Sequence, residues 1–404
     1  MSLISNLDKI QFTRVFRWAE DLLALLVILS IFIYPAYFGP TRLENYALPL
    51  FIMVLGLKSL NFDRNLVNLL MINMVIGLVS VLLNLNLSHG LLELMRWVKY
   101  AVVLVFFSSL SYHQVSKIPG YIRLAFIIMT LVNVIQIVNP FDFGVELAKF
   151  YSHHPLYPEG SIEMDKSFRL LGTAINPNNN ALLWLLMSIY FMVEFYNEKK
   201  TQSLLFVFGC FLFIIFTQSR TAIVAFLLIG LLNLFLYRLK IRHLLYIAGM
   251  GLFGAFIAIY FQFTYLWHIF LFNPLKIHSL RLRFKIWDDM LKLYYQKPFF
   301  GWGNLKNYEV LYSKPPDNEI LYILLNQGSV GIFGMTLLFI YIVHYFKGRT
   351  KKVALSYLPI FMIICFVIIG MTNLSVTNVR IGMLFFVTCG MSFAYVKNEN
   401  QLNE

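Results

Sequence analysis

Residues 279–296 read SLRLRFKIWDDMLKLYYQ, an amphipathic stretch in a chain made mostly of long apolar runs. At 100° per residue one side collects the polar side chains, with Arg281 at its edge: Lys285, Asp288, Asp289, Lys292 and Gln296. Arg283 points instead onto the apolar face, beside Met290 and Leu293. Because burying an unpaired charge is costly, we expect Arg283 to snorkel at the helix start, to pair with a carboxylate of the protein or to bind an anionic ligand.

The composition is typical of a polytopic membrane protein, since 59% of the residues are hydrophobic and 13% are charged. The formal charge of +13 is spread through the segments between apolar runs, so we expect no nucleic-acid partner. Cys210, Cys365 and Cys389 each lie inside an apolar run. We expect them to be small buried side chains, with no disulfide framework and no metal site.

The apolar runs predict an all-α fold with about twelve transmembrane helices in a single integral membrane domain over residues 1–404. The predicted spans are 20–38, 45–60, 66–86, 93–112, 119–138, 178–197, 202–218, 220–237, 244–264, 320–346, 353–372 and 377–396. Lys and Arg recur in every second short loop, which by the positive-inside rule places both termini in the cytoplasm.

Two longer segments, 139–177 and 265–319, fall on the opposite side of this topology. Both exceed the roughly two to eight residues that usually connect packed helices. The second segment contains the amphipathic stretch and carries eight Lys and Arg residues against five Asp and Glu residues. A basic excess on the outer side runs against the usual bias. It indicates that residues 265–319 form a large loop that binds an anionic ligand.

Arg220 is the strongest single candidate for a ligand-binding side chain. It closes the polar sequence TQSR (217–220) between two apolar runs, at a predicted membrane boundary. Thr217 and Ser219 can cap the following helix, whose N-terminus offers free N–H groups and a positive dipole end. A guanidinium there would suit a phosphate or diphosphate, because arginine presents a planar fork to phosphate oxygens. The alternative is an arginine that snorkels at the interface.

A second polar cluster follows the first long segment, in RLLGTAINPNNN (169–180). Asn176 and Pro177 suit the cap and first turn of a helix, and this local role is one interpretation. In the other, Arg169, Asn176 and Asn178 face a polar cavity and bind sugar hydroxyls or phosphate. Arg380, at the start of the last span, could add its charge to the same pocket or serve as a snorkelling anchor.

The triplet Asp317-Asn318-Glu319 stands where the large loop returns to the membrane. Its carboxylates could interact with the N-terminus of the next helix. Alternatively, one of them is a general base that takes a proton from an attacking hydroxyl. Gly328 and Gly331 follow closely and predict a broken helix, which membranes tolerate where the backbone lines a cavity or is buried in protein.

Taken in order, these motifs resemble the O-antigen ligase/polymerase superfamily of lipid-linked glycan transferases. The motifs are RLLG (169–172) with NPN (176–178), TQSR (217–220), SLRLR (279–283) followed by KPFFGWG (297–303), and DNEIL (317–321) with the two downstream glycines. The resemblance implies a GT-C-type architecture in the bacterial inner membrane. It also implies a periplasmic site that transfers a glycan from undecaprenyl diphosphate without a metal or other cofactor.

The resemblance further implies roles for individual residues. Arg220 and Arg283 match arginines that contact the diphosphate, and either Asp317 or Glu319 would be the base. The ligases carry a histidine where this chain has Asp317, which favours an inverting O-antigen polymerase over a ligase that acts on lipid A core. Arg169, Asn176, Asn178, Asn318, Arg281 and Arg380 would contact the substrate.

The expected partners are undecaprenyl-diphosphate-linked repeat units, membrane lipids and a Wzz-type chain-length regulator. A different class, a lipid-linked oligosaccharide flippase or other transporter, would be expected to place ionisable residues at mid-membrane. The centres of the predicted spans are nearly free of charge. This pattern favours an enzyme that works at the membrane surface.

Overall fold

The computed structural model describes residues 2–34, 56, 62–85, 87–152, 169–174, 176–236, 241–261, 278–303, 317–347, 354–374 and 377–403. Every regular element within these ranges is helical. The long helices are α1 (Ser2–Phe32), α3 (Arg64–Leu83), α4 (Leu87–Ser108), α6 (Ile118–Val138), α9 (Pro177–Glu198), α10 (Thr201–Thr217), α11 (Arg220–Leu236), α12 (Ile241–Tyr260), α14 (His278–Gln296), α16 (Glu319–Lys347), α17 (Tyr357–Gly370) and α18 (Val379–Asn403). The short ones are α5 (Tyr112–Val115), η1 (Pro140–Asp142), α7 (Phe143–Ser152) and η3 (Ala354–Ser356).

The all-helical prediction is confirmed over the described residues, and each predicted span other than 45–60 overlaps a helix. That span lies outside the described residues, apart from Gly56. Among the described residues, four helical segments are long and apolar enough to cross a membrane: Arg64–Leu83, Tyr112–Val138, Glu319–Lys347 and Val379–Asn398. The count of twelve spans stays a prediction. The first helix differs from expectation, because α1 begins at Ser2 and ends at Phe32 instead of covering 20–38.

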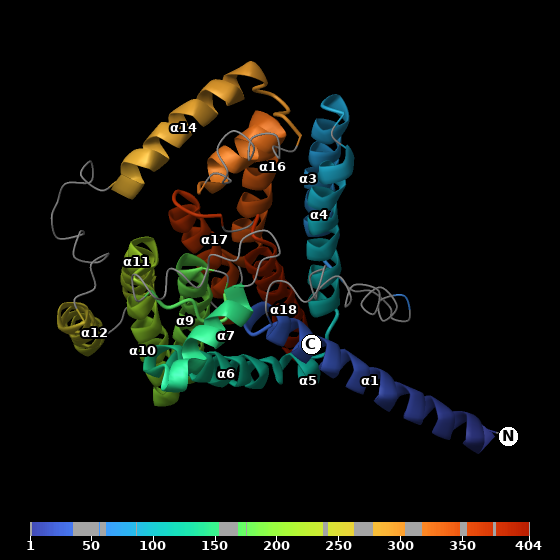
Figure 1. Cartoon of the computed structure of the whole chain (residues 1–404). Coiled ribbons are helices and arrows are strands. Elements are labelled where there is room, and N and C mark those ends of the chain that lie inside the picture. Colours follow the sequence, from blue (N-terminus) through green and yellow to red (C-terminus); the bar gives the residue numbers. More distant parts are fainter. Residues whose placement is uncertain are drawn as a thin grey trace.

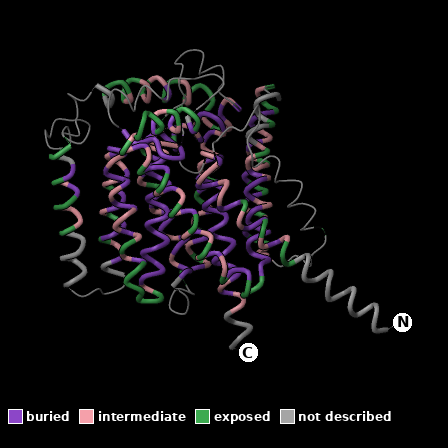
Figure 2. The backbone as a smooth tube through the Cα atoms, turned by 60° about the horizontal axis from the view of Figure 1, so that its bottom comes forward, coloured by how far each residue is buried: buried purple, intermediate pink, exposed green. Residues whose placement is uncertain are grey.

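Most of the long helices pack side by side in a bundle, and α14 lies across one end of it (Figures 1 and 2), whereas α1 extends obliquely out of the bundle (Figure 1). Helix α9 is in the interior, packed on α10, α11 and α17, and its side chains are buried on every side from Asn180 to Phe195. Trp184 of α9 stacks on Phe213 of α10 with ring centroids 4.6 Å apart. Such close packing is what associates helices in a bilayer, where lipid tails are as apolar as the side chains.

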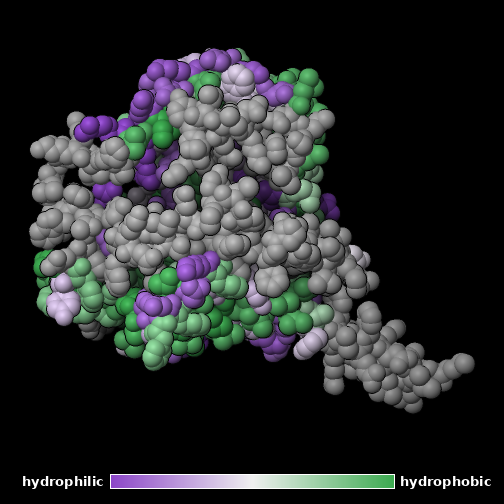
Figure 3. All heavy atoms as spheres, viewed as in Figure 1, coloured by the Kyte–Doolittle hydropathy of each residue, from purple (hydrophilic) through white to green (hydrophobic). Residues whose placement is uncertain are grey.

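Helices at the outside of the bundle expose apolar side chains, among them Ile72 and Val75 of α3 and Leu131 of α6. Lipid tails are the natural cover for such surfaces. Hydrophilic residues instead gather over α14, at the top of Figure 3. The molecule therefore combines apolar flanks with one polar end. We use "polar end" for the end at which α9, α11, α16 and α18 begin and across which α14 lies.

Helix α16 is broken at Gly328, as the sequence predicted (φ 66°, ψ −165°). Residues 298–303, which follow α14, dock into the break. The Trp302 and Gly303 amides donate to the Leu325 and Asn326 carbonyls at 2.7 and 3.0 Å. In the other direction, Ser329 N donates to the Pro298 carbonyl at 2.8 Å. The backbone groups freed by the break are thus satisfied by protein, as a membrane-embedded helix requires.

Glycine is required where these two segments cross. A Cβ at Gly328 would lie 2.1 Å from the Phe299 carbonyl oxygen, and a Cβ at Gly301 (φ 65°) would lie 2.5 Å from the Leu325 carbonyl oxygen. Both positions also have the positive φ that other residues avoid. On α3, the Ser80 hydroxyl donates to the Asn326 carbonyl at 2.5 Å. These contacts fix α14 relative to the first turns of α16.

Candidate active site at the polar end

Arg283, a predicted diphosphate ligand, lies in direct contact with Asp317, one of the two candidates for the base. Arg283 Nη2 donates to Asp317 Oδ2 at 3.1 Å, and the Asp317 side chain is 53% exposed. The apolar face of α14 packs on α16 around Met290, Leu321 and Leu325. This packing brings the guanidinium to the start of α16. Arg283 is therefore paired with a carboxylate of the protein, which was one of the three interpretations of its place on the apolar face.

Asn318 and Glu319 are turned inward, unlike Asp317. Asn318 Oδ1 accepts from Leu321 N at 3.0 Å and so caps α16, while its amide nitrogen donates to the Met371 carbonyl at the end of α17. Glu319 is 6% exposed and accepts from Thr377 N at 2.9 Å and from Thr377 Oγ1 at 3.0 Å. The cap is therefore formed by the amide between the two acids, and Glu319 ties α16 to the segment before α18.

Arg220 begins α11, and α17 links it to the start of α16. The Thr372 hydroxyl donates to the Thr221 hydroxyl at 2.8 Å, one residue after Met371, which Asn318 contacts. Gln218 (φ 54°) ends α10 in the left-handed conformation and allows the sharp turn into α11. Arg220 is half-buried in this turn. The N-termini of α11 and α16 thus approach the same end of α17, each with its positive dipole end.

Arg169 and Asn178 are brought together, but mainly with protein groups. Arg169 is buried; its Nε donates to the Thr217 carbonyl at 3.2 Å and its Nη2 donates to Asn178 Oδ1 at 3.1 Å. Asn176 caps α9 by accepting from Asn179 N at 2.8 Å. The local role considered for Asn176 and Pro177 is therefore present. Arg169 docks the segment before α9 onto the TQSR turn, whatever contacts with a substrate these residues also make.

Arg380, near the start of α18, contacts the segment that precedes α9. Its Nη1 donates to the Thr173 carbonyl at 3.1 Å, and the Thr173 hydroxyl donates to the Phe32 carbonyl of α1. Burial raises the pKa of the nearby Tyr151 phenol on α7, and the positive charge of Arg380 opposes this rise. Arg380 is thus close to α7, a helix within the first of the two long segments (139–177). Residues 153–168 of that segment lie outside the described residues.

Arg281 lies on the exposed side of α14, two residues before Arg283. The loop on both sides of α14, residues 265–277 and 304–316, is outside the described residues. Sequence analysis missed Thr377 and Thr372, which hold the starts of α16 and α11. No periodicity or charge pattern distinguishes these threonines. Their position in short polar turns at helix ends was the one available signal.

This arrangement can bind an anion and move a proton. Arginine side chains and helix N-termini at the polar end favour a phosphate-like group. An exposed carboxylate beside them can accept a proton from a hydroxyl. The apolar helices beneath this site, packed as a bundle, are typical of a multi-pass membrane protein, and the polar end lies at one end of that bundle.

Residues 205–336 match a family model described as O-Antigen ligase. The matched range contains the TQSR turn, α14 and the first part of α16. This match over residues 205–336 supports the resemblance to the O-antigen ligase/polymerase superfamily, a group of glycosyltransferase-like enzymes, that the motifs predicted. No curated protein matches the chain.

Proposed function

We propose that this chain is an O-antigen polymerase. It transfers a growing glycan from undecaprenyl diphosphate to a hydroxyl of another lipid-linked repeat unit, at the periplasmic face of the bacterial inner membrane. The observation that carries the proposal is the exposed Asp317 carboxylate, 3.1 Å from Arg283, at the position where the related ligases carry a histidine. A carboxylate can take the proton of a sugar hydroxyl, and the guanidinium can serve the leaving diphosphate.

The proposed reaction is a single displacement. The acceptor hydroxyl attacks the anomeric carbon, its proton goes to Asp317, and the bond from that carbon to the diphosphate oxygen breaks. The diphosphate leaves with the bonding electrons, and the anomeric configuration inverts. Arg220 and Arg283 neutralise the charge that develops on the leaving group, so the step needs no metal. The guanidinium of Arg283 has five N–H donors, and its contact with Asp317 uses Nη2, so it can bridge the base and the diphosphate.

Burial supports Asp317 over Glu319 as the base. The Glu319 carboxylate already accepts two hydrogen bonds from Thr377 and is 6% exposed. A sugar hydroxyl would have to displace that threonine to reach it. Asp317 is open to solvent at the start of the helix. We assign proton abstraction to Asp317 and the positioning of α16 to Glu319.

A ligase that transfers the glycan to lipid A core is the second candidate, because the matching family model is described as an O-Antigen ligase. The two reactions share the donor and differ in the acceptor. The residue at position 317 favours the polymerase, since it departs from the histidine of the ligases.

The test uses purified protein in detergent with one repeat unit on undecaprenyl diphosphate and no other acceptor. A ladder of multiples that is lost in D317A is the expected result. Transfer that appears only after lipid A core is added would make the chain a ligase. Inactivity with both acceptors, together with lipid translocation in liposomes, would make it a transporter. A ladder that survives D317A and is lost in E319A would keep the function and move the base.

A further inference from the structure

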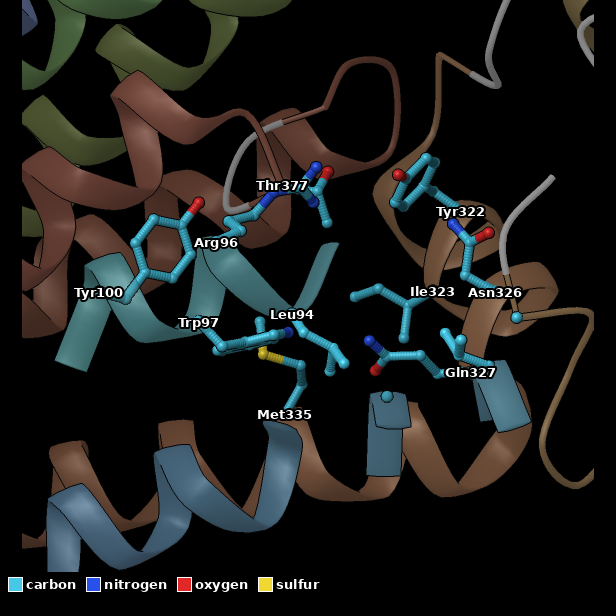
Figure 4. Close-up of a pocket in the computed structure, with 13 residues that line it drawn as sticks. Leu94, Arg96, Trp97, Tyr100, Tyr322, Ile323, Asn326, Gln327, Met335 and Thr377 are labelled. Atoms are coloured by element: carbon cyan, nitrogen blue, oxygen red, sulfur yellow. The ribbon is translucent and has the colours of Figure 1, made fainter. Parts of the chain in front are cut away.

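The cavity between α3, α4 and α16 is too small for a sugar or a lipid. Figure 4 shows part of its lining, with Gln327 of α16 extending towards Leu94 and Trp97 of α4. The space has room for about one water molecule, to which the Asn326 and Gln327 amides can hydrogen-bond. By contrast, α7 and the turn before it expose a continuous apolar surface.

A line of exposed apolar side chains runs along α6 and leads to this turn. Their spacing alternates between three and four residues, which keeps them on one face of the helix. The line consists of Leu124, Ile127, Leu131, Val134 and Val138, which are 41–67% exposed, and it is followed by Phe141 at 104%. Helix α6 ends at the polar end, where Gln136 Nε2 donates to the Gly172 carbonyl at 2.9 Å. The line therefore leads from the apolar flank of the bundle to its polar end.

The turn at 139–142 displays Phe141 in an unfavourable backbone conformation. Asn139, Phe141 and Asp142 have φ values of 48°, 52° and 62°, which residues with a side chain rarely adopt. Asn139 holds the turn, because its Oδ1 accepts from Val145 N and its Nδ2 donates to Asp142 Oδ1, each at 3.2 Å. A bulky residue persists in this region only where its surroundings offset the strain. An apolar cover over the Phe141 ring would do so.

One side of α7 packs on the bundle. Gly144, Ala148 and Tyr151 share this side and are buried. A Cβ at Gly144 would lie 2.7 Å from the Ile135 carbonyl oxygen, so glycine is required for α7 to fold against the end of α6 (Figure 1). Ala148 packs on Leu171, in the segment before α9. These contacts fix the orientation of α7 and turn its other sides outward.

The outward part of α7 separates apolar from charged side chains. Phe143 and Phe150 are 54% and 53% exposed. They lie within about 20° of each other around the helix. Glu146 and Lys149 lie on the adjacent side, where their side chains pair at 2.6 Å. An apolar side next to a charged one is typical of a helix that lies in the plane of a membrane interface.

We propose that α7 and the turn before it insert into the lipid leaflet at the polar end, with Phe141, Phe143 and Phe150 below the headgroups. Their surface continues the apolar flank of α6, for which lipid tails are the natural cover, so the same lipids reach it. Amphipathic helices of this kind bury their apolar side about 5–10 Å into the boundary between headgroups and acyl chains. The pair of Glu146 and Lys149 then lies on the water side.

The insertion gives the first long segment a function. Arg380 is close enough to Tyr151 of α7 for the guanidinium charge to act on the phenol. An α7 that is anchored in the leaflet therefore holds Arg380 at the depth of the lipid phosphates. This anchor is independent of the reaction that takes place at the polar end.

Insertion is tested on full-length protein in vesicles of phosphatidylcholine and phosphatidylglycerol, with a nitrobenzoxadiazole label on single introduced cysteines. The three native cysteines are buried, so background labelling should be low. F150C and K149C are matched variants, since the two positions are adjacent and exposed but belong to different sides of α7. F150C should emit at a shorter wavelength and be quenched about threefold more by lipids that carry a nitroxide near the headgroup end of the acyl chain. F141C and F143C should behave like F150C.

Three outcomes would overturn the proposal. Emission from F141C, F143C and F150C as in water would mean that the surface is solvated. Shielded emission without quenching by the nitroxide lipids would mean that protein covers it. Equal quenching of K149C and F150C would mean that the label enters the membrane by its own affinity. The replaced side chains are exposed, so each variant should keep a melting temperature close to that of the unmodified protein.

Discussion

The Asp317 carboxylate is 53% exposed and 3.1 Å from Arg283, so its removal should affect chemistry much more than folding. An exposed ion pair of this kind contributes at most about 1 kcal/mol to stability. General-base catalysis contributes about 10²–10⁴-fold to a rate. We therefore expect D317N to lower kcat by that factor with an unchanged melting temperature, measured on purified protein. A D317N enzyme with a near-normal rate would exclude Asp317 as the base.

The corresponding change at Glu319 should affect stability much more than the catalytic rate. Glu319 is buried and accepts from both the amide and the hydroxyl of Thr377. In E319Q the carboxylate is replaced by a neutral amide, whose NH₂ group can bond only if the Thr377 hydroxyl turns to accept, so the charge-assisted hydrogen bonds are lost at a cost of about 1–3 kcal/mol. We expect a lower melting temperature and a rate per folded molecule within about tenfold of wild type. T377V, which removes the hydroxyl, should reproduce part of the destabilisation. Full stability of E319Q with complete loss of transfer would move the base to Glu319.

The ion pair of Arg283 and Asp317 can be tested as a pair. If the contact only held α14 on α16, exchanging the charges in R283D/D317R would preserve its effect. In the proposed mechanism the exchange puts an arginine at the position of the base and an acid beside the diphosphate, so both functions are lost. We expect the double variant to fold and to make no ladder. Restored polymerisation would show that the pair is structural.

The sequence predicted that Arg283 lies on the apolar face of its helix and that its charge must be compensated. It did not predict that Asp317 is the compensating group. Helical periodicity places Arg283 on the apolar face of its helix from local sequence alone. Its partner is 34 residues further along the chain. That pairing depends on how α14 docks, which hydropathy does not encode. Likewise, whether Asn318 caps α16 or faces a ligand depends on a helix boundary one residue away.

At the scale of elements, α14, residues 297–303 and the broken α16 act as one unit. The paired glycines predicted the break, because a membrane helix with freed backbone groups must be satisfied by nearby protein. They did not predict what satisfies it. The docked segment uses backbone hydrogen bonds to Leu325 and Asn326, and backbone contacts leave no side-chain pattern in the sequence. The glycines and Ser80 are the residues whose side chains, or lack of one, are specific to this contact.

G328A tests whether residues 297–303 dock into the break of α16. A methyl at Gly328 would meet the Phe299 carbonyl oxygen at 2.1 Å. The backbone at φ 66° and ψ −165° is also a region open essentially only to glycine. We expect a loss of about 3 kcal/mol or more, seen as a lower melting temperature in detergent.

G251A is the matched control for this change. A Cβ at Gly251 of α12 meets no atom within 4 Å. The substitution should leave stability unchanged or raise it by up to about 1 kcal/mol, the difference in helix propensity. Equal melting temperatures for G328A and G251A would contradict the docked arrangement of residues 297–303.

For the whole molecule, hydropathy predicted which segments are helical, because a bilayer fixes the length of the apolar run that crosses it. It could not predict that α1 begins at Ser2, or that residues 143–152 of the first long segment form a helix. Those elements are too polar or too short to register as spans. Side-chain contacts then place every predicted site residue on α14 or beside the helix starts of the polar end. These residues thus lie at one end of the molecule, as the proposed lipid-linked substrate requires.

Which side of the membrane the polar end faces can be measured by cysteine labelling, and the chain suits the experiment. Its three cysteines are buried, so background labelling should be low. D288C would place a thiol on the exposed face of α14, and K200C would place one at the opposite end, between α9 and α10; the replaced side chains are 65% and 53% exposed. With a membrane-impermeant maleimide, we expect D288C to label in intact cells and K200C only after the inner membrane is opened. The reverse pattern would put the site in the cytoplasm, away from periplasmic repeat units, and would exclude the proposed polymerase.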